Sequence, residues 1–112
     1  TDRSLINEQL QYAKEQNKYI IIEASHQRCP YCERMNDNVF SDDEVRETLK
    51  EHFAFIKIDI THGNSALPDT VKNLFKGGTP TFFILDSTST VEDTIVGSMS
   101  KDEFLGLLDM YM

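Results

Sequence analysis

The chain has 112 residues, and its 19 acidic against 11 basic side chains leave a net charge of about −8. This length fits one domain with a real core, which we expect to span residues 1–112. The negative charge argues against nucleic acid and anionic membranes as partners, and no apolar run approaches the roughly 18 residues of a membrane span, so no membrane insertion is expected.

The chain begins with a helical pattern that is followed by a strand pattern. A helix is predicted from Ser4 to Gln16, with Leu5, Leu10 and Ala13 available for its apolar face. The β-branched run from Tyr19 to Ala24 predicts a strand that is buried on both faces.

Two further helices and a second strand follow. The segment Cys29-Pro30-Tyr31-Cys32 opens a helix, where proline suits the first position because the missing N–H would have no partner there. Ser41-Asp42-Asp43-Glu44 is a capping box, so another helix is predicted from about Ser41. The mostly apolar run from Phe53 to Ile60 predicts a strand.

The second half of the chain predicts a short helix, a hairpin and a last helix. The short helix runs from about Asp69 to Lys76, with Gly77 as its C′ residue. Thr81 to Asp86 and Val91 to Val96 form the hairpin. A second capping box at Ser100 to Glu103 opens the last helix.

The order of predicted elements is therefore α-β-α-α-β-α-β-β-α. Strands joined through a helix should be parallel by right-handed crossover, whereas the hairpin strands must be antiparallel. This predicts an α/β fold with a mixed four-stranded sheet and helices on both faces. A fifth edge strand before residue 1 stays open, because the chain starts at Thr1 without an initiator Met and is expected to be a processed or truncated form.

The two cysteines, Cys29 and Cys32, are the only ones in the sequence. Thiols three positions apart can form a disulfide without straining the backbone, and the helix start stabilises a thiolate on the first of them. The pair thus indicates reversible thiol-disulfide chemistry. Two alternatives stay open: a structural disulfide, or half of a zinc site completed by His26 and His62.

Three local features resemble the thioredoxin superfamily, and the resemblance spans essentially the whole chain. They are the Cys-Pro-Tyr-Cys motif after a buried strand, Thr79-Pro80 before a later strand, and Glu23 ahead of the motif. The resemblance implies a thioredoxin fold in which a cis-proline loop faces the dithiol. Substrates are then expected to bind over Thr79 and Pro80 on that loop and over Pro30 and Tyr31 between the cysteines.

The resemblance also implies a role for each reactive residue. Cys29 would be the exposed nucleophile that attacks a substrate disulfide, and Cys32 the buried resolving thiol. Glu23 would accept the proton of Cys32, with a pKa raised by burial. The alternative is that Glu23, near the end of its strand, reaches water. Glu at this place departs from the Asp of thioredoxins.

The dipeptide Pro-Tyr between the cysteines is typical of glutaredoxins, which favours glutathione chemistry. The Gly-Gly pair that glutaredoxins carry after the cis-proline strand is missing, however, since Gly77-Gly78 come before Pro80. The segments Tyr31 to Val45 and Phe53 to Asp59 instead resemble bacterial thioredoxin-related proteins, many of them exported.

This branch implies a monomeric, periplasmic protein-disulfide reductase without a cofactor or metal. Its partners would be protein disulfides and a membrane or soluble thiol electron donor. Three alternatives stay open: a glutathione-dependent reductase, a peptide-binding module without turnover, and a cytoplasmic location.

Overall fold

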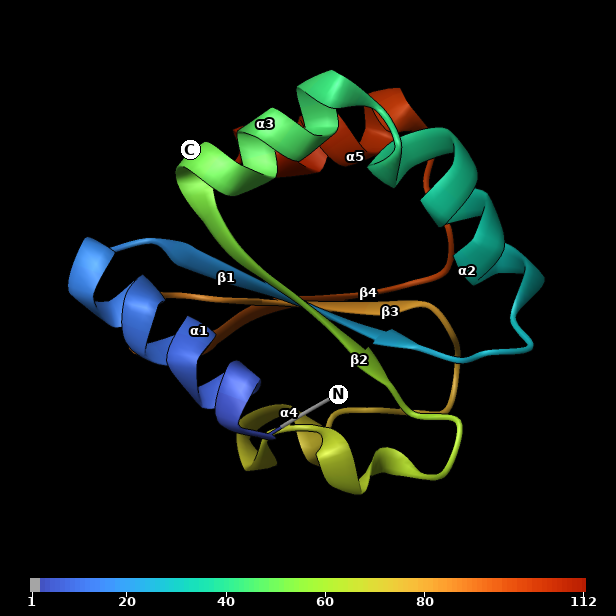
Figure 1. The fold of residues 1–112 in the computed structure, drawn as a ribbon, viewed down its shortest axis with the longest axis horizontal. Helices are drawn as coiled ribbons and strands as arrows, with labels where there is room; N and C mark the ends of the chain where they lie inside the picture. The colour runs from blue at the N-terminus through green and yellow to red at the C-terminus, as the bar shows by residue number, and fades with distance from the viewer. Residues whose placement is uncertain (1–2) are drawn as a thin grey trace.

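The computed structural model describes residues 3–112, so Thr1 and Asp2 of the predicted domain lie outside the described part. Helices and strands alternate along most of this range (Figure 1). In chain order they are α1 (Arg3–Gln16), β1 (Tyr19–Ser25), α2 (Pro30–Met35), the π-helix η1 (Asn36–Phe40), α3 (Asp43–His52), β2 (Phe53–Asp59), the 3-10 turn η2 (Asn64–Ala66), α4 (Asp69–Lys72), β3 (Thr81–Leu85), β4 (Val91–Val96) and α5 (Lys101–Asp109).

The four strands form one mixed sheet in the order β2-β1-β3-β4. Strand β1 is parallel to β2, whereas β3 is antiparallel to both β1 and β4. The predicted α/β fold with a mixed four-stranded sheet is confirmed. Strand β1 lies inside the sheet with five consecutive buried residues, as its β-branched run predicted.

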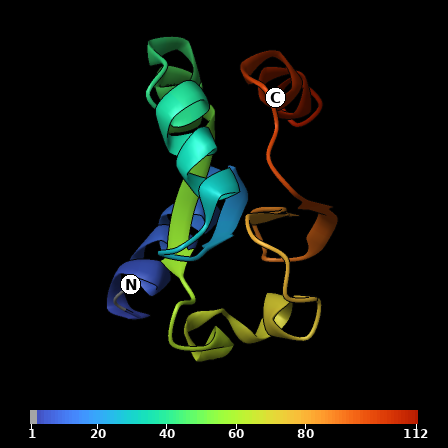
Figure 2. The same ribbon diagram turned by 90° about the vertical axis from the view of Figure 1, so that its right-hand side faces the viewer.

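Helices cover both faces of the sheet, with α1 and α4 on one face and α2, α3 and α5 on the other (Figures 1 and 2). Alternate residues of a strand point to opposite faces. Ile20 and Ile22 of β1 therefore belong to the core under α1, and Ile21 to the core under α5, together with Phe104. In the described range no helix is long and apolar enough to cross a membrane.

The predicted apolar face of α1 is wrong at its first position. Leu5 is 56% exposed, whereas its neighbour Ile6 is 3% exposed and packs in the core with Ala13 and the partly buried Leu10. Residues 6, 10 and 13 are four and three positions apart and share one side of a helix, while residue 5 is rotated by about 100° from residue 6. Packing against the sheet therefore buries Ile6 and leaves Leu5 exposed to solvent.

We expect Ile6→Ala to lower the free energy of unfolding by about 2–5 kcal/mol, because it leaves a cavity in a packed core. Leu5→Ala is the matched control on the same helix and should change it by less than about 0.5 kcal/mol. Urea unfolding followed by circular dichroism measures both. Equal effects of the two substitutions would contradict the observed face of α1.

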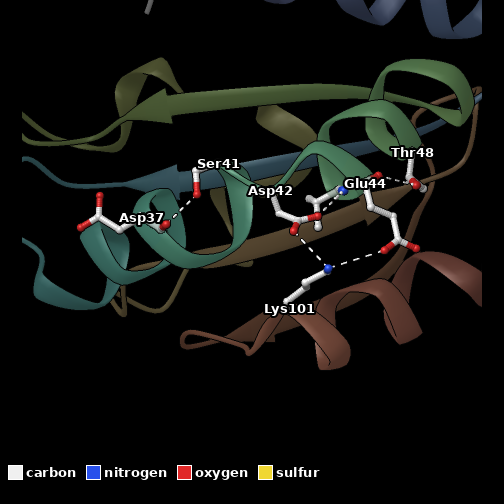
Figure 3. A network of polar contacts seen from close by, with 7 residues as sticks. Asp37, Ser41, Asp42, Glu44, Thr48 and Lys101 are labelled. Carbon is white, nitrogen blue, oxygen red and sulfur yellow. Dashed lines mark hydrogen bonds and ion pairs between the residues drawn. The ribbon is translucent and has the colours of Figure 1, made fainter.

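Helix α3 begins one residue later than predicted, because Asp42 and not Ser41 is its N-cap. The Asp42 carboxylate accepts the N–H of Val45 at 3.2 Å and pairs with the Lys101 ammonium of α5 at 3.0 Å (Figure 3). Ser41 instead donates its hydroxyl to the carbonyl of Asp37 at 2.6 Å. A carboxylate that serves both a helix end and a lysine is the better cap here, and it joins α3 to α5.

Of two further predicted helix ends, the start of α5 is confirmed and the end of α4 is wrong. The capping box at Ser100 is confirmed, since its hydroxyl accepts the N–H of Glu103 and the Glu103 side chain accepts the N–H of Ser100. Helix α4, in contrast, ends at Lys72 with Asn73 as its C-cap, so the predicted helix to residue 76 is wrong. The N–H groups of three successive residues from Asn73 on all turn back to the carbonyl of Val71, which leaves no helical ladder to continue. Gly77, with φ of +98°, lies in the loop before β3.

Candidate active site

The two cysteines lie at the start of α2. This helix directly follows the loop after β1 (Figure 1). They form a disulfide, with their Cα atoms 5.2 Å apart. Cys29 is the N-cap of α2 and Pro30 its first residue, so no backbone donor is lost at the proline. The N–H of Cys32 donates to the sulfur of Cys29 at 3.1 Å. A backbone donor aimed at this sulfur would stabilise a thiolate there once the disulfide is reduced.

The loop between α4 and β3 lies against the sulfur of Cys29. The Thr79 hydroxyl donates to the Cys29 sulfur at 3.2 Å, and the Thr79 carbonyl oxygen lies 3.4 Å from the same sulfur. The peptide bond between Thr79 and Pro80 is cis. Cys29 is only 4% exposed and Cys32 2%, so the expected exposure of Cys29 is not found in the oxidised protein. Thr79, from 50 residues away in the chain, is the neighbour that meets this sulfur.

We expect Thr79→Val to slow the alkylation of reduced Cys29 by iodoacetamide about tenfold at pH 7. Valine has nearly the same shape but donates no hydrogen bond to the thiolate, and bonds to charged groups contribute about 1.5–3 kcal/mol. The rate is measured by mass spectrometry in a Cys32→Ala background, so that only one thiol reacts. Thr79→Ser keeps the hydroxyl and should react at the wild-type rate, whereas a wild-type rate for valine would remove any role of the hydroxyl.

The other residues expected to contact substrate differ in exposure. Pro30 is exposed, and Tyr31 is 53% exposed with the guanidinium of Arg34 5.2 Å from the centre of its ring. Pro80 is buried, and its carbonyl accepts the N–H of Gly97. A substrate chain could therefore meet the side chains of Pro30 and Tyr31 and the half-buried Thr79, while Pro80 shapes the loop from within.

Glu23 is fully buried within β1. Neither oxygen of its carboxylate has a hydrogen-bond partner among the described residues. The Lys57 ammonium lies 3.7 Å from Oε1, in register with Glu23 on the neighbouring strand β2. Burial raises the pKa of Glu23 to about 7, and the charge of Lys57 offsets part of this rise. The alternative that Glu23 reaches water is wrong.

Lys57 lies between this carboxylate and an open cleft of about 410 Å³ beside the disulfide. The sequence did not lead us to predict a role for Lys57. Cys32 and Lys57 are among the residues that line the cleft, and the Lys57 side chain is 38% exposed. A signal for Lys57 was present in the sequence, because Lys57 interrupts the apolar run from Phe53 to Ile58, at the position that pairs with Glu23. A carboxyl with a pKa of about 7, as Glu23 has, can exchange protons at neutral pH.

The possible zinc ligands do not gather in the structure. Within residues 3–112, no group of three or more His, Cys, Asp or Glu side chains has the arrangement of a metal site. The Nδ1 atom of His26 instead accepts the N–H of Arg28, in the loop that leads to Cys29. That loop is further held by Gln27, which donates to the carboxylate of Asp59 at the end of β2.

Comparisons with known proteins point to one family. The family model described as a thioredoxin-like domain matches residues 6–111. The oxidised C-terminal domain of DsbD from Neisseria meningitidis is 19% identical, with 97% of this chain and 94% of that chain covered and a TM-score of 0.79. A thioredoxin from Thermus thermophilus is 25% identical, with 93% and 81% covered and a TM-score of 0.75. No curated protein matches the sequence.

Proposed function

Because the chain belongs to the thioredoxin-like domain family, we propose that it is a thiol-disulfide oxidoreductase that reduces protein disulfides through Cys29 and Cys32. One observation carries the proposal: the Cys29 sulfur receives hydrogen bonds from the Cys32 N–H and the Thr79 hydroxyl. A structural disulfide needs no such donors, whereas an attacking thiolate is stabilised by both.

In the first step the reduced protein forms a mixed disulfide. The Cys29 thiolate attacks one sulfur of the substrate disulfide, so that a bond forms between Cys29 and that sulfur while the substrate S–S bond breaks. The other substrate sulfur leaves as a thiolate and takes a proton from water. The Cys32 N–H and the Thr79 hydroxyl hold the attacking sulfur at the N-terminus of α2.

In the second step Cys32 resolves the mixed disulfide. Its thiol is buried, so a base is needed to take the proton, and Glu23 is the acceptor we propose. The Cys32 thiolate attacks the Cys29 sulfur, and the bond between Cys29 and the substrate sulfur breaks. That substrate sulfur leaves as a thiolate and takes up a proton, and the Cys29–Cys32 disulfide forms again. Two electrons have passed to the substrate, and an external dithiol must return them before the next cycle.

The setting of this reaction is also part of the proposal. We expect a monomer outside the cytoplasm that receives electrons from a membrane or soluble thiol carrier, as the resemblance to exported thioredoxin-related proteins implies. Cell fractionation and analytical ultracentrifugation test the location and the oligomeric state.

The proposal is tested by an equilibrium titration of the Cys29–Cys32 pair against reduced and oxidised glutathione, together with a turbidity assay of insulin reduction. A reductase should hold its disulfide at a potential well below that of glutathione and should reduce insulin in the presence of dithiothreitol. A pair as oxidising as those of disulfide-forming enzymes, without insulin reduction, would refute the direction that we propose.

A further inference from the structure

The Lys57 ammonium is held by more than the buried carboxylate beside it. It donates a hydrogen bond to the side-chain oxygen of Asn36, and it lies 5.2 Å from the centre of the Phe40 ring. Asn36 and Phe40 are the first and last residues of the π-helix η1. The Lys57 side chain thus reaches from β2 between the Glu23 carboxylate on one side and η1 on the other.

Asn36 is also tied to the reactive helix. Its backbone N–H donates to the carbonyl of Cys32, one turn earlier, so its position follows that of the resolving cysteine. Asn36, Cys32 and Lys57 line the same cleft. π-helical turns are rare in proteins, and those that occur are often found at functional sites. Here the π-helical turn places an amide and an aromatic ring next to one lysine.

We propose that Asn36 is a positioning residue, whose side-chain oxygen holds the Lys57 ammonium next to the buried Glu23 carboxylate. The inference deepens the proposed function and rests on it for its catalytic consequence. Lys57 has an exposed route to water along the cleft, and an ammonium is strongly hydrated. Without an acceptor at residue 36 the ammonium is expected to turn toward water and to move away from Glu23.

Loss of that contact has a defined direction. Lys57 favours the charged form of Glu23, so withdrawing the ammonium leaves the desolvation of the carboxylate less compensated. The midpoint of the Glu23 titration should therefore move upward. The other titratable groups that line the cleft are His26, Glu33 and Asp59, and Asp59 is held by hydrogen bonds from Thr61 and Gln27.

The test is a carbon-13 NMR titration of the Glu23 carboxyl in the oxidised protein, where neither cysteine titrates and neither can shift the midpoint. Asn36→Leu, which has similar volume and no acceptor, should raise the midpoint by about one pH unit, within the range that a nearby charge produces. Asn36→Ala removes the same acceptor and should shift the midpoint in the same direction.

The matched control is Asn38→Leu, which replaces another exposed asparagine of the same π-helix and should leave the midpoint unchanged. Lys57→Met should raise the midpoint at least as far as Asn36→Leu does. In that background Asn36→Leu should add no further shift, because it acts through the ammonium that has been removed. An unchanged or lowered midpoint in Asn36→Leu, or full additivity with Lys57→Met, would overturn the proposal.

The kinetic consequence is measured separately. If Glu23 accepts the Cys32 proton, raising its midpoint by one unit from about 7 leaves about a tenth of it ionised at pH 7, and resolution of a mixed disulfide should slow about fivefold. The NMR shift needs no turnover, so a wild-type protein that fails to reduce insulin refutes the proposed function without touching the role of Asn36. A shifted midpoint with an unchanged, working reductase would overturn only the catalytic consequence.

Discussion

Replacing Cys29 by serine is expected to lower insulin reduction to the rate seen without the protein. The Cys29 sulfur is the one that receives the two hydrogen bonds, so it is the thiolate that can attack. A serine hydroxyl stays protonated at neutral pH and does not attack disulfides. Cys32→Ser should also stop turnover, but one step later, because the first attack leaves a mixed disulfide that no thiol resolves.

The two substitutions are distinguished by mass spectrometry under non-reducing conditions. Cys32→Ser should accumulate a covalent adduct with the substrate that dithiothreitol releases, and Cys29→Ser should form none. The two cysteines differ little in exposure, 4% against 2%, so this order tests the hydrogen bonds and not accessibility. Adducts on Cys32 in the Cys29→Ser protein at the wild-type rate would reverse the assigned roles.

Glu23→Gln is expected to stabilise the protein above neutral pH and to slow disulfide reduction. The pKa of Glu23 rises from 4.5 to about 7 on folding. Below pH 4.5 the carboxyl is protonated in both states and carries no cost of ionisation. Between pH 4.5 and about 7 the unfolded chain ionises this carboxyl while the buried carboxyl of the folded protein stays protonated, so wild-type stability falls over this range and levels off above it. A difference of about 2.5 units at about 1.4 kcal/mol each is a cost of about 3 kcal/mol above pH 7.

Urea unfolding at pH 4, 6 and 8 measures this cost. The free energy of unfolding of Glu23→Gln minus that of the wild type should grow by about 3 kcal/mol between pH 4 and pH 8. Glu33→Gln, which replaces an exposed glutamate that lines the same cleft, is the control and should not reproduce this growth, because its side chain is already in water in the folded protein. A flat difference for Glu23→Gln as well would show that this carboxyl is not a buried acid.

The same variant tests the proposed proton transfer. Glutamine cannot accept a proton, so the resolving attack by Cys32 should slow by about a hundredfold, the lower range for loss of a general base. Stopped-flow measurement of product release from a preformed mixed disulfide isolates this step. If Glu23→Gln is more stable than the wild type but resolves the mixed disulfide at the same rate, Glu23 is a buried acid that takes no part in catalysis.

Much of the fold could be predicted because its signals are local. The β-branched run of β1, the hairpin and the Ser100 capping box are each written in a few neighbouring residues, and the structure has them as expected. The Cys29–Cys32 pair could be recognised for the same reason. Local patterns were insufficient where two neighbouring residues could fill one position. The buried residue of α1 is Ile6 and not Leu5, and the N-cap of α3 is Asp42 and not Ser41.

The surroundings of the cysteines depended on contacts that no local pattern encodes. The Thr79 hydroxyl meets the Cys29 sulfur across 50 residues of sequence, and Lys57 meets Asn36 across 21. Such contacts follow from strand register and from how helices pack on the sheet, and a shift of one residue in β2 would turn Lys57 to the other face. The sequence by itself determined the fold class and the cysteine pair that forms the disulfide. Only the tertiary structure decided that Glu23 is buried, that Lys57 stands beside it, and which side chains touch the reactive sulfur.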